Sequence, residues 1–422
     1  MKINDLRVDS IFLWKLLLLS WIYLGFFRYV FPQISTPLYF IHDLLIVVIF
    51  LKFRAKEINL RHILAWLILA SLMIYQFFSY IFGNVTLVGF VQGINLYCLG
   101  MLLFVSTENN DLRLRAMNFT SIIEISMLPN FILAVLQVPL KIPYFQKSTL
   151  TDLGHLNSSD GYIRAYGTFT STAGFTLYLS VIFAYCLTNL NRTSRFKGIF
   201  LQLVALSMLV MSQSRTALVI VIFQYIIYAL ILQRTANDFS LQPFTPNRKK
   251  VRLGRVLILI IAFLIFILPD TLRAFSNRIS QASRAENSIS RLLDQQFSWL
   301  NYVDYGLVGD GLASHTIGVV GYLNSSHLWI EKDLERIFAE SGLVLGLFII
   351  LFRLCWAVLL LKSFNILLHN RQIEMAILIP ALLITLLQGP LYGQNDTNIF
   401  GWIFLTIFAS TRQKNNSSIP NR

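Results

Sequence analysis

Charged residues, cysteines and the residues of fibrous proteins are all scarce in this sequence. Only 13% of its 422 residues are charged, about half the share of a soluble protein, which excludes a soluble globular enzyme and a disordered chain. Three cysteines cannot support a disulfide scaffold, and Phe and Tyr (34 and 17) outnumber Gly and Pro (21 and 11), which excludes a fibrous repeat. The motifs HExxH, CxxC, GxGxxG and the P-loop do not occur, so the sequence predicts no metal and no cofactor.

Apolar residues are abundant instead. They make up 55% of the chain, and the mean hydropathy is +0.62. A membrane-spanning helix needs about 20 mostly apolar residues, so the chain has enough for about twelve of them. The sequence therefore predicts an all-α protein, a polytopic transmembrane bundle of about 12 spans. The expected spans are residues 11–31, 37–53, 62–82, 85–106, 116–140, 166–190, 196–213, 215–232, 255–270, 337–361, 375–388 and 397–411.

The basic residues orient this bundle. With the N-terminus inside the cell, the seven cytoplasmic segments hold 22 Lys and Arg residues, against ten on the opposite face. Cytoplasmic loops of membrane proteins carry such an excess, so we expect both termini to be cytoplasmic. The net charge of +14 then belongs to these loops, and nucleic acid is not an expected partner.

Two connections divide the chain. Residues 233–255 form a basic cytoplasmic linker within a first part, residues 1–270, that holds nine spans. Residues 271–336 form one long external loop, and residues 337–422 hold three further spans and a cytoplasmic tail. Connections as long as 271–336 are usually functional or disordered. Apolar residues near Arg291 recur at helical spacing, which predicts an amphipathic helix within the loop.

Two external arginines are the first candidate site residues. Arg164 precedes the sixth span, and Arg215 lies at the tight external turn between the seventh and eighth spans. The planar guanidinium donates two parallel hydrogen bonds, which suits the oxygens of a diphosphate, and a helix N-terminus also favours anions. Both arginines are candidates for substrate binding and catalysis. The alternative is that each side chain reaches lipid phosphates or caps a helix end.

The long loop and its exit supply the remaining candidates. His315 and His327 lie on the external side, where a histidine could take a proton from an acceptor hydroxyl. Glu335, Arg336 and Glu340 follow at the loop exit. Glu331 and Glu335 share one helix face, so a solvated, self-paired charged helix is the alternative reading of this stretch.

Three of these features occur in an order that resembles the O-antigen polymerase and O-antigen ligase superfamily. RAYGTF followed by STAGF leads into a span, SRTAL opens the next hairpin, and a long loop with the turn GDGLAS returns through AESGLVLGLFI. The resemblance covers residues 160–350. It implies a GT-C-like enzyme of the bacterial cytoplasmic membrane that transfers lipid-diphosphate-linked glycans on the external face.

The resemblance also implies roles for individual residues. Arg164 and Arg215 match external arginines of the family, which engage the diphosphate or the glycan. His327 lies where family members often have His-Asn, but Leu328 follows it here, and GDGLAS departs from the family's Gly-x-Gly-x-Gly turn. Arg336 is therefore preferred over His327 as an active-site residue. The full set of expected catalytic residues is Arg164, Arg215, His315, His327, Glu335 and Arg336, and the expected substrate-binding residues are Arg164, Arg215, Arg291 and Glu340.

The expected function is polymerisation of polyprenyl-diphosphate-linked repeat units into a surface polysaccharide. The partners that the resemblance implies are the lipid-linked glycan, membrane lipid, a flippase and a chain-length regulator. The nearest alternative is a ligase that transfers finished polymer to a lipid A-core or another acceptor. A secondary transporter or glycolipid flippase is the alternative of another class, with Glu124 as its candidate coupling carboxylate.

Overall fold

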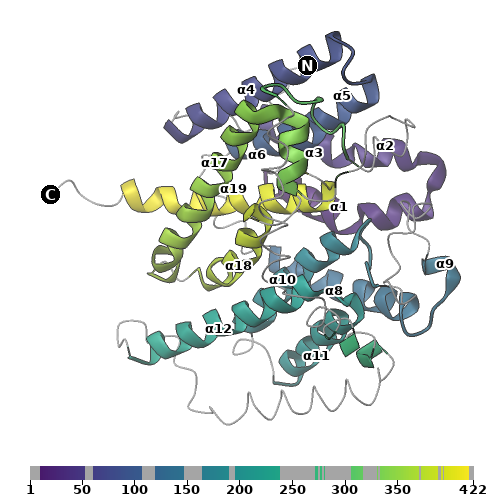
Figure 1. Ribbon diagram of the computed structural model, residues 1–422. Helices are drawn as coiled ribbons and strands as arrows, with labels where there is room; N and C mark the ends of the chain where they lie inside the picture. The colour runs from purple at the N-terminus through teal and green to yellow at the C-terminus, as the bar shows by residue number, and fades with distance from the viewer. Residues whose placement is uncertain are drawn as a thin grey trace, which may run out of the picture.

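All secondary-structure elements of the computed structural model are helices among the residues that it describes (Figure 1). These residues are 10–52, 60–106, 119–146, 164–189, 195–237, 271–273, 276–277, 280, 306–316, 330, 333–369, 372–387, 391–392 and 394–417. The elements are α1 (Ser10–Val30), η2 (Pro32–Ile34), α2 (Ser35–Tyr39), α3 (Ile41–Lys52), α4 (Leu60–Ile81), α5 (Leu87–Gly93), η3 (Ile94–Leu99), α6 (Gly100–Ser106), α8 (Phe119–Gln137), α9 (Pro143–Gln146), α10 (Thr172–Asn189), α11 (Arg195–Ser212), α12 (Arg215–Asn237), α17 (Asp333–His369), α18 (Ile373–Leu387) and α19 (Asn395–Ser417).

The helices follow the hydropathy of the sequence closely. Eleven of the twelve expected spans are helical, and the remaining one, 255–270, lies outside the described residues. Within the described part, six helices are long and apolar enough to cross a membrane, and four shorter apolar helices accompany them. The all-helical fold is therefore confirmed for the described residues, and the length and composition of these helices are consistent with a membrane protein. The number of spans stays a prediction. Of the basic linker, only residues 233–237 are described, and they continue α12.

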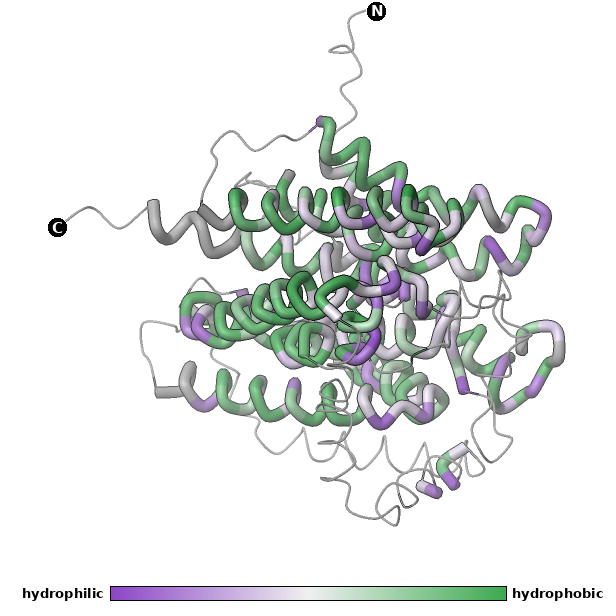
Figure 2. The backbone as a smooth tube through the Cα atoms, turned by 45° about the horizontal axis from the view of Figure 1, so that its top comes forward, coloured by the Kyte–Doolittle hydropathy of each residue, from purple (hydrophilic) through white to green (hydrophobic). Residues whose placement is uncertain are grey.

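Helix α10 forms the centre of the bundle. Its residues from Gly174 to Thr188 are all buried, and it packs against α8, α11, α12, α18 and α19. The outer helices turn large apolar side chains outward, among them Phe77 on α4, Ile222 on α12 and Leu351 on α17. Figure 2 shows that hydrophobic residues dominate these helices and that hydrophilic residues gather at several helix ends and connections. Surfaces of this kind fit lipid rather than water.

The chain folds back within α17, at Gly342. In a straight helix, residues 20 positions apart are separated by about 30 Å, yet Nη1 of Arg353 lies 2.5 Å from Oδ2 of Asp333. The reversal is made by Gly342, whose φ is 73° and ψ is 179°. Residues 333–341 therefore form a separate short helix beside the long one (Figure 1). The long apolar helix begins after Gly342 rather than at residue 337, where the span was expected.

One end of the bundle collects the polar connections. We call it the polar end and define it by residues 164–171, 306–316, 333–342, 391–392 and 394–396. Backbone hydrogen bonds join Phe26 to Thr168 and Ala165 to Met211, at 2.8 Å and 3.0 Å. The side-chain amide of Asn398 donates to Leu96 O, which fastens α19 to the segment between α5 and α6. Connections that are far apart in the sequence thus gather at one end of the bundle.

Candidate functional site

Residues 306–316 dock as a tight loop on the reversal at Gly342. The amide nitrogens of Asp310 and Gly311 each donate to a carbonyl of residues 339–340, at 2.9 Å. The approach is so close that a Cβ on Gly309 would lie 2.5 Å from Ala339 O, and a Cβ on Gly342 would lie 2.5 Å from Leu307 O. Glycine is therefore required on both sides of this contact.

The carboxylate of Glu340 holds the loop through hydrogen bonds to its backbone. It is fully buried, and its two oxygens accept hydrogen bonds from the amides of Ala313 (2.9 Å) and His315 (3.1 Å). The hydroxyl of Tyr97 donates a third hydrogen bond at 2.6 Å. Tyr97 lies in η3, a π-helical turn between α5 and α6, and such turns are frequent at functional sites. A buried carboxylate is tolerated only with partners of this kind, so Glu340 fixes the backbone that carries His315.

Two arginines and an aspartate complete this buried network. Oδ1 and Oδ2 of Asp333 each lie 2.5 Å from an arginine, Arg336 and Arg353 respectively. Arg353 also donates from Nε to Leu386 O at 2.5 Å, in the last turn of α18. Nε of Arg336 lies 3.8 Å from Glu340. Two positive and two negative charges thus balance one another in the interior, as buried ions require.

His315 forms a pair with Asp310 at the edge of the network. The Nε2 atom of His315 lies 2.8 Å from Oδ2 of Asp310, with the imidazole almost fully buried and the carboxylate about one-third exposed. A carboxylate in this position orients the imidazole and stabilises its protonated form. The pair therefore has the parts of a general base.

Arg164 and Arg215 belong to a different corner of the polar end. Ala165, next to Arg164, donates its amide to Met211 O, four residues before Arg215. Arg215 is exposed as the first residue of α12, whereas Arg164 is half-buried. Gln137 holds the segment by accepting hydrogen bonds from the amides of residues 166 and 167. Burial also raises the pKa of the Tyr166 hydroxyl, which therefore stays neutral and donates to Phe145 O at 2.7 Å.

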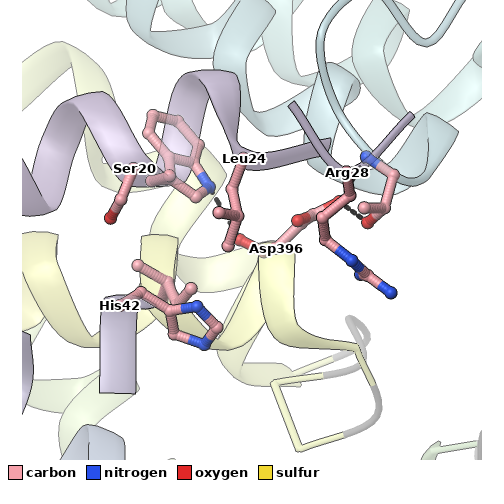
Figure 3. Close-up of a pocket in the computed structure, with 8 residues that line it drawn as sticks. Ser20, Leu24, Arg28, His42 and Asp396 are labelled. Atoms are coloured by element: carbon pink, nitrogen blue, oxygen red, sulfur yellow. Dashed lines mark hydrogen bonds between the residues drawn. The ribbon is translucent and has the colours of Figure 1, made fainter. Parts of the chain in front are cut away.

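A small pocket opens at the same end, between α1, α3 and the start of α19 (Figure 3). Asp396 lies at its centre, where its Oδ2 accepts hydrogen bonds from Thr170 Oγ1 (2.5 Å) and Thr170 N (3.2 Å). Its backbone carbonyl accepts from Trp21 Nε1 at 2.8 Å. Arg28 and His42 line the pocket on either side of Asp396. The complete lining is Ser20, Trp21, Leu24, Arg28, His42, Thr170, Asp396 and Ile399.

The expected site residues thus fall into separate groups. His315, Arg336 and Glu340 come together in the buried network, and Glu335 is buried on the same short helix. The hydrogen bond from Ala165 to Met211 joins the segments that lead to Arg164 and Arg215 at the other corner. Arg291 and His327 lie outside the described residues.

Sequence reasoning did not assign Asp310, Asp333 or Tyr97 to the site. The sequence does indicate that Arg353 has a buried partner, because a charge inside an apolar stretch needs one. The carboxylate that pairs with it, Asp333, could be identified only once the reversal at Gly342 was known.

The opposite end of the bundle has its own ion pair. Glu124 on α8 pairs with Lys197 on α11 and accepts a hydrogen bond from Tyr185 at 2.6 Å.

Among the described residues, no group of three or more His, Cys, Asp or Glu side chains could hold a metal ion. A scan against models of known protein families found no match to this chain, and a search of curated proteins found no significantly similar sequence.

Proposed function

We propose that this chain is a glycosyltransferase of the bacterial cytoplasmic membrane. Its reaction joins polyprenyl-diphosphate-linked repeat units into a surface polysaccharide on the external face. The polar end would face outward, both termini would be cytoplasmic, and the bundle would be of the GT-C-like class. Its partners would be the lipid-linked glycan, membrane lipid, a flippase and a chain-length regulator.

The observation that carries this proposal is the meeting of the two motif segments. The hydrogen bond between Ala165 and Met211 brings RAYGTF beside SRTAL at one corner. Arg164 and Arg215, selected from those motifs, therefore share a corner of a helical membrane bundle. Two permanent positive charges at a membrane surface suit the diphosphate of a lipid carrier.

The chemistry requires a base and a stabilised leaving group. In this proposal the His315 imidazole, oriented by Asp310, accepts the proton of the acceptor hydroxyl. The hydroxyl oxygen then bonds to the anomeric carbon of the donor sugar, while the bond from that carbon to the diphosphate oxygen breaks. The diphosphate departs with the electron pair, and Arg164 and Arg215 stabilise its charge. Binding both lipid-linked reactants in one membrane orients them for reaction.

The buried network gives the loop-exit residues a supporting role in this scheme. Arg336 contacts Asp333 and Glu340, and Glu340 accepts hydrogen bonds from the docked loop. In this proposal both residues position His315 instead of touching the substrate.

The gene deletion tests the function directly. Surface and lipid-linked glycans from a deletion strain are separated by size on a gel. We expect the ladder of long polymers to collapse to single repeat units and to return when the gene is restored. Long polymer stranded on its lipid carrier would instead identify a ligase, and an unchanged ladder would overturn the proposal.

The transporter alternative is the weaker one. Its candidate coupling residue, Glu124, is held by Lys197 and Tyr185 near the start of α8. Repeat units trapped on the inner leaflet of the deletion strain would favour a flippase.

A further inference from the structure

The pocket around Asp396 carries an inference that the proposed function does not contain. It is made by the first and last described helices together with α3 and the segment 164–171. Three titratable side chains, Arg28, His42 and Asp396, line this one small pocket in a chain with only 13% charged residues. Polar side chains in an apolar bundle are costly and usually functional.

Neighbouring residues hold these side chains in place. Thr170 and Ser171 donate hydrogen bonds to Oδ2 of Asp396. His42 is almost fully buried and lies 2.7 Å from the carboxylate of Asp43. Asn95, on the same π-helical turn as Tyr97, donates to the other oxygen of Asp43 at 2.5 Å. The pocket is therefore preorganised, which lowers the entropic cost of binding a ligand.

The combination of groups selects the chemistry of the ligand. The carboxylate of Asp396 disfavours a phosphate in this pocket, since the two negative charges would repel each other. A sugar hydroxyl both donates and accepts, so it can donate to Asp396 while it accepts from Arg28. Thr170 and Ser20 extend the same pattern with further hydroxyl groups.

We propose that this pocket is a carbohydrate subsite, in which Asp396 and Arg28 bind adjacent hydroxyls of one sugar of the glycan. The nature of the ligand rests on the proposed function. The subsite itself lies apart from the arginine corner, although the segment 164–171 connects the two through Thr170. Asp396 and Arg28 bind the sugar directly, and His42, backed by Asp43, shapes the pocket.

The test measures binding separately from catalysis. The full chain is placed in lipid nanodiscs, and the probe is the free repeat-unit oligosaccharide, released by mild acid from the lipid-linked pool of the same cells. Saturation-transfer NMR gives its dissociation constant. We expect Asp396→Asn and Arg28→Gln each to weaken binding about tenfold, as the loss of one charged hydrogen bond predicts.

A matched control comes from the opposite end. Glu374 is also an acidic residue in the first turn of a helix, α18, and Glu374→Gln should leave the dissociation constant unchanged. Arg28 is half-exposed at the end of α1, so Arg28→Gln still provides the test if Asp396→Asn fails to fold. Unfolding temperatures of all three variants verify their folding.

The outcomes separate the two proposals. The subsite proposal would be overturned if the wild type and both pocket variants bound the oligosaccharide equally. It would also be overturned if the pocket bound inorganic diphosphate in place of the oligosaccharide. Polymer formation in the same nanodiscs would nevertheless uphold the proposed function. Oligosaccharide binding that depends on Asp396, with no polymer from the wild type, would uphold the subsite and overturn the polymerase.

Discussion

Arg353 shows how one residue can organise the polar end. It pairs with Asp333 across the reversal and donates to the last turn of α18, so it connects three segments of the chain. Replacement by methionine keeps much of the volume but leaves Asp333 with one arginine in the interior. We predict that Arg353→Met lowers the free energy of unfolding by about 3–5 kcal/mol, measured by chemical unfolding in detergent.

A second substitution distinguishes lost pairing from lost packing. Adding Asp333→Asn to Arg353→Met removes the stranded charge, so the double variant should be more stable than the sum of the single effects. Strict additivity of Arg353→Met and Asp333→Asn would contradict the assigned pairing.

The shape of the Arg215 side chain, and not only its charge, matters for the proposed role. Lysine keeps the charge but loses the planar fork that binds two phosphate oxygens. We predict that Arg215→Lys reduces polymer yield about tenfold, the loss expected for one charge-assisted hydrogen bond, without changing the unfolding temperature. Glycan ladders from complemented deletion strains measure the yield. The matched control is Lys362→Arg, at an exposed position on the part of α17 that is far from the polar end. If the Arg215→Lys strain makes as much polymer as the wild type, Arg215 has no role in the mechanism.

At the scale of elements, the reversal at Gly342 offers the sharpest comparison. Alanine at Gly342 meets both a positive φ of 73° and the backbone of residues 307–309 within 2.5–2.8 Å. Alanine at Gly83 meets a similar φ of 77° but no atom within 4 Å. We predict a loss of about 1 kcal/mol for Gly83→Ala, from backbone strain alone, and a clearly larger loss for Gly342→Ala. Thermal unfolding in detergent compares the two, and equal losses would mean that the loop does not dock as described.

Most of the helices could be predicted from hydropathy, because eleven of the expected apolar runs are helical in the structure. The reversal could not. Glu340, Ser341 and Gly342 lie at the edge of an apolar run, and hydropathy does not report the direction in which a chain continues. Glycine at a positive φ is a local feature, but its meaning depends on Leu307 and Gly309, which are more than 30 positions away.

The candidate site was predictable only in part, for a similar reason. Their places in the long loop and at its exit selected His315, Arg336 and Glu340, which the fold brings together. The pocket at Asp396 depends on contacts between α1 and α19, such as that of Trp21 with Asp396. No spacing in a single sequence encodes a contact over 375 positions.

At the scale of the whole molecule, the orientation of the bundle can be measured. Phe82, exposed beside the polar end, and Lys362, on the distal part of α17, lie at opposite ends. In a background with exposed Cys355 replaced by alanine, we predict that Phe82→Cys reacts with a membrane-impermeant maleimide in intact cells. Lys362→Cys should react only after permeabilisation, since the positive-inside rule places it in the cytoplasm. The reverse pattern would invert the topology and separate the polar end from any external substrate.

The contact between Trp21 and Asp396 also sets an order of events during biosynthesis. Helix α1 is synthesised early, but the carbonyl that accepts the hydrogen bond of the Trp21 indole belongs to a residue translated 375 positions later. Arg353 similarly emerges before the α18 carbonyl that it contacts. A nascent chain that stops before residue 396 therefore leaves the indole nitrogen of Trp21 without this partner. Such incomplete chains should be recognised and degraded by membrane proteases, so that only nearly full-length protein accumulates.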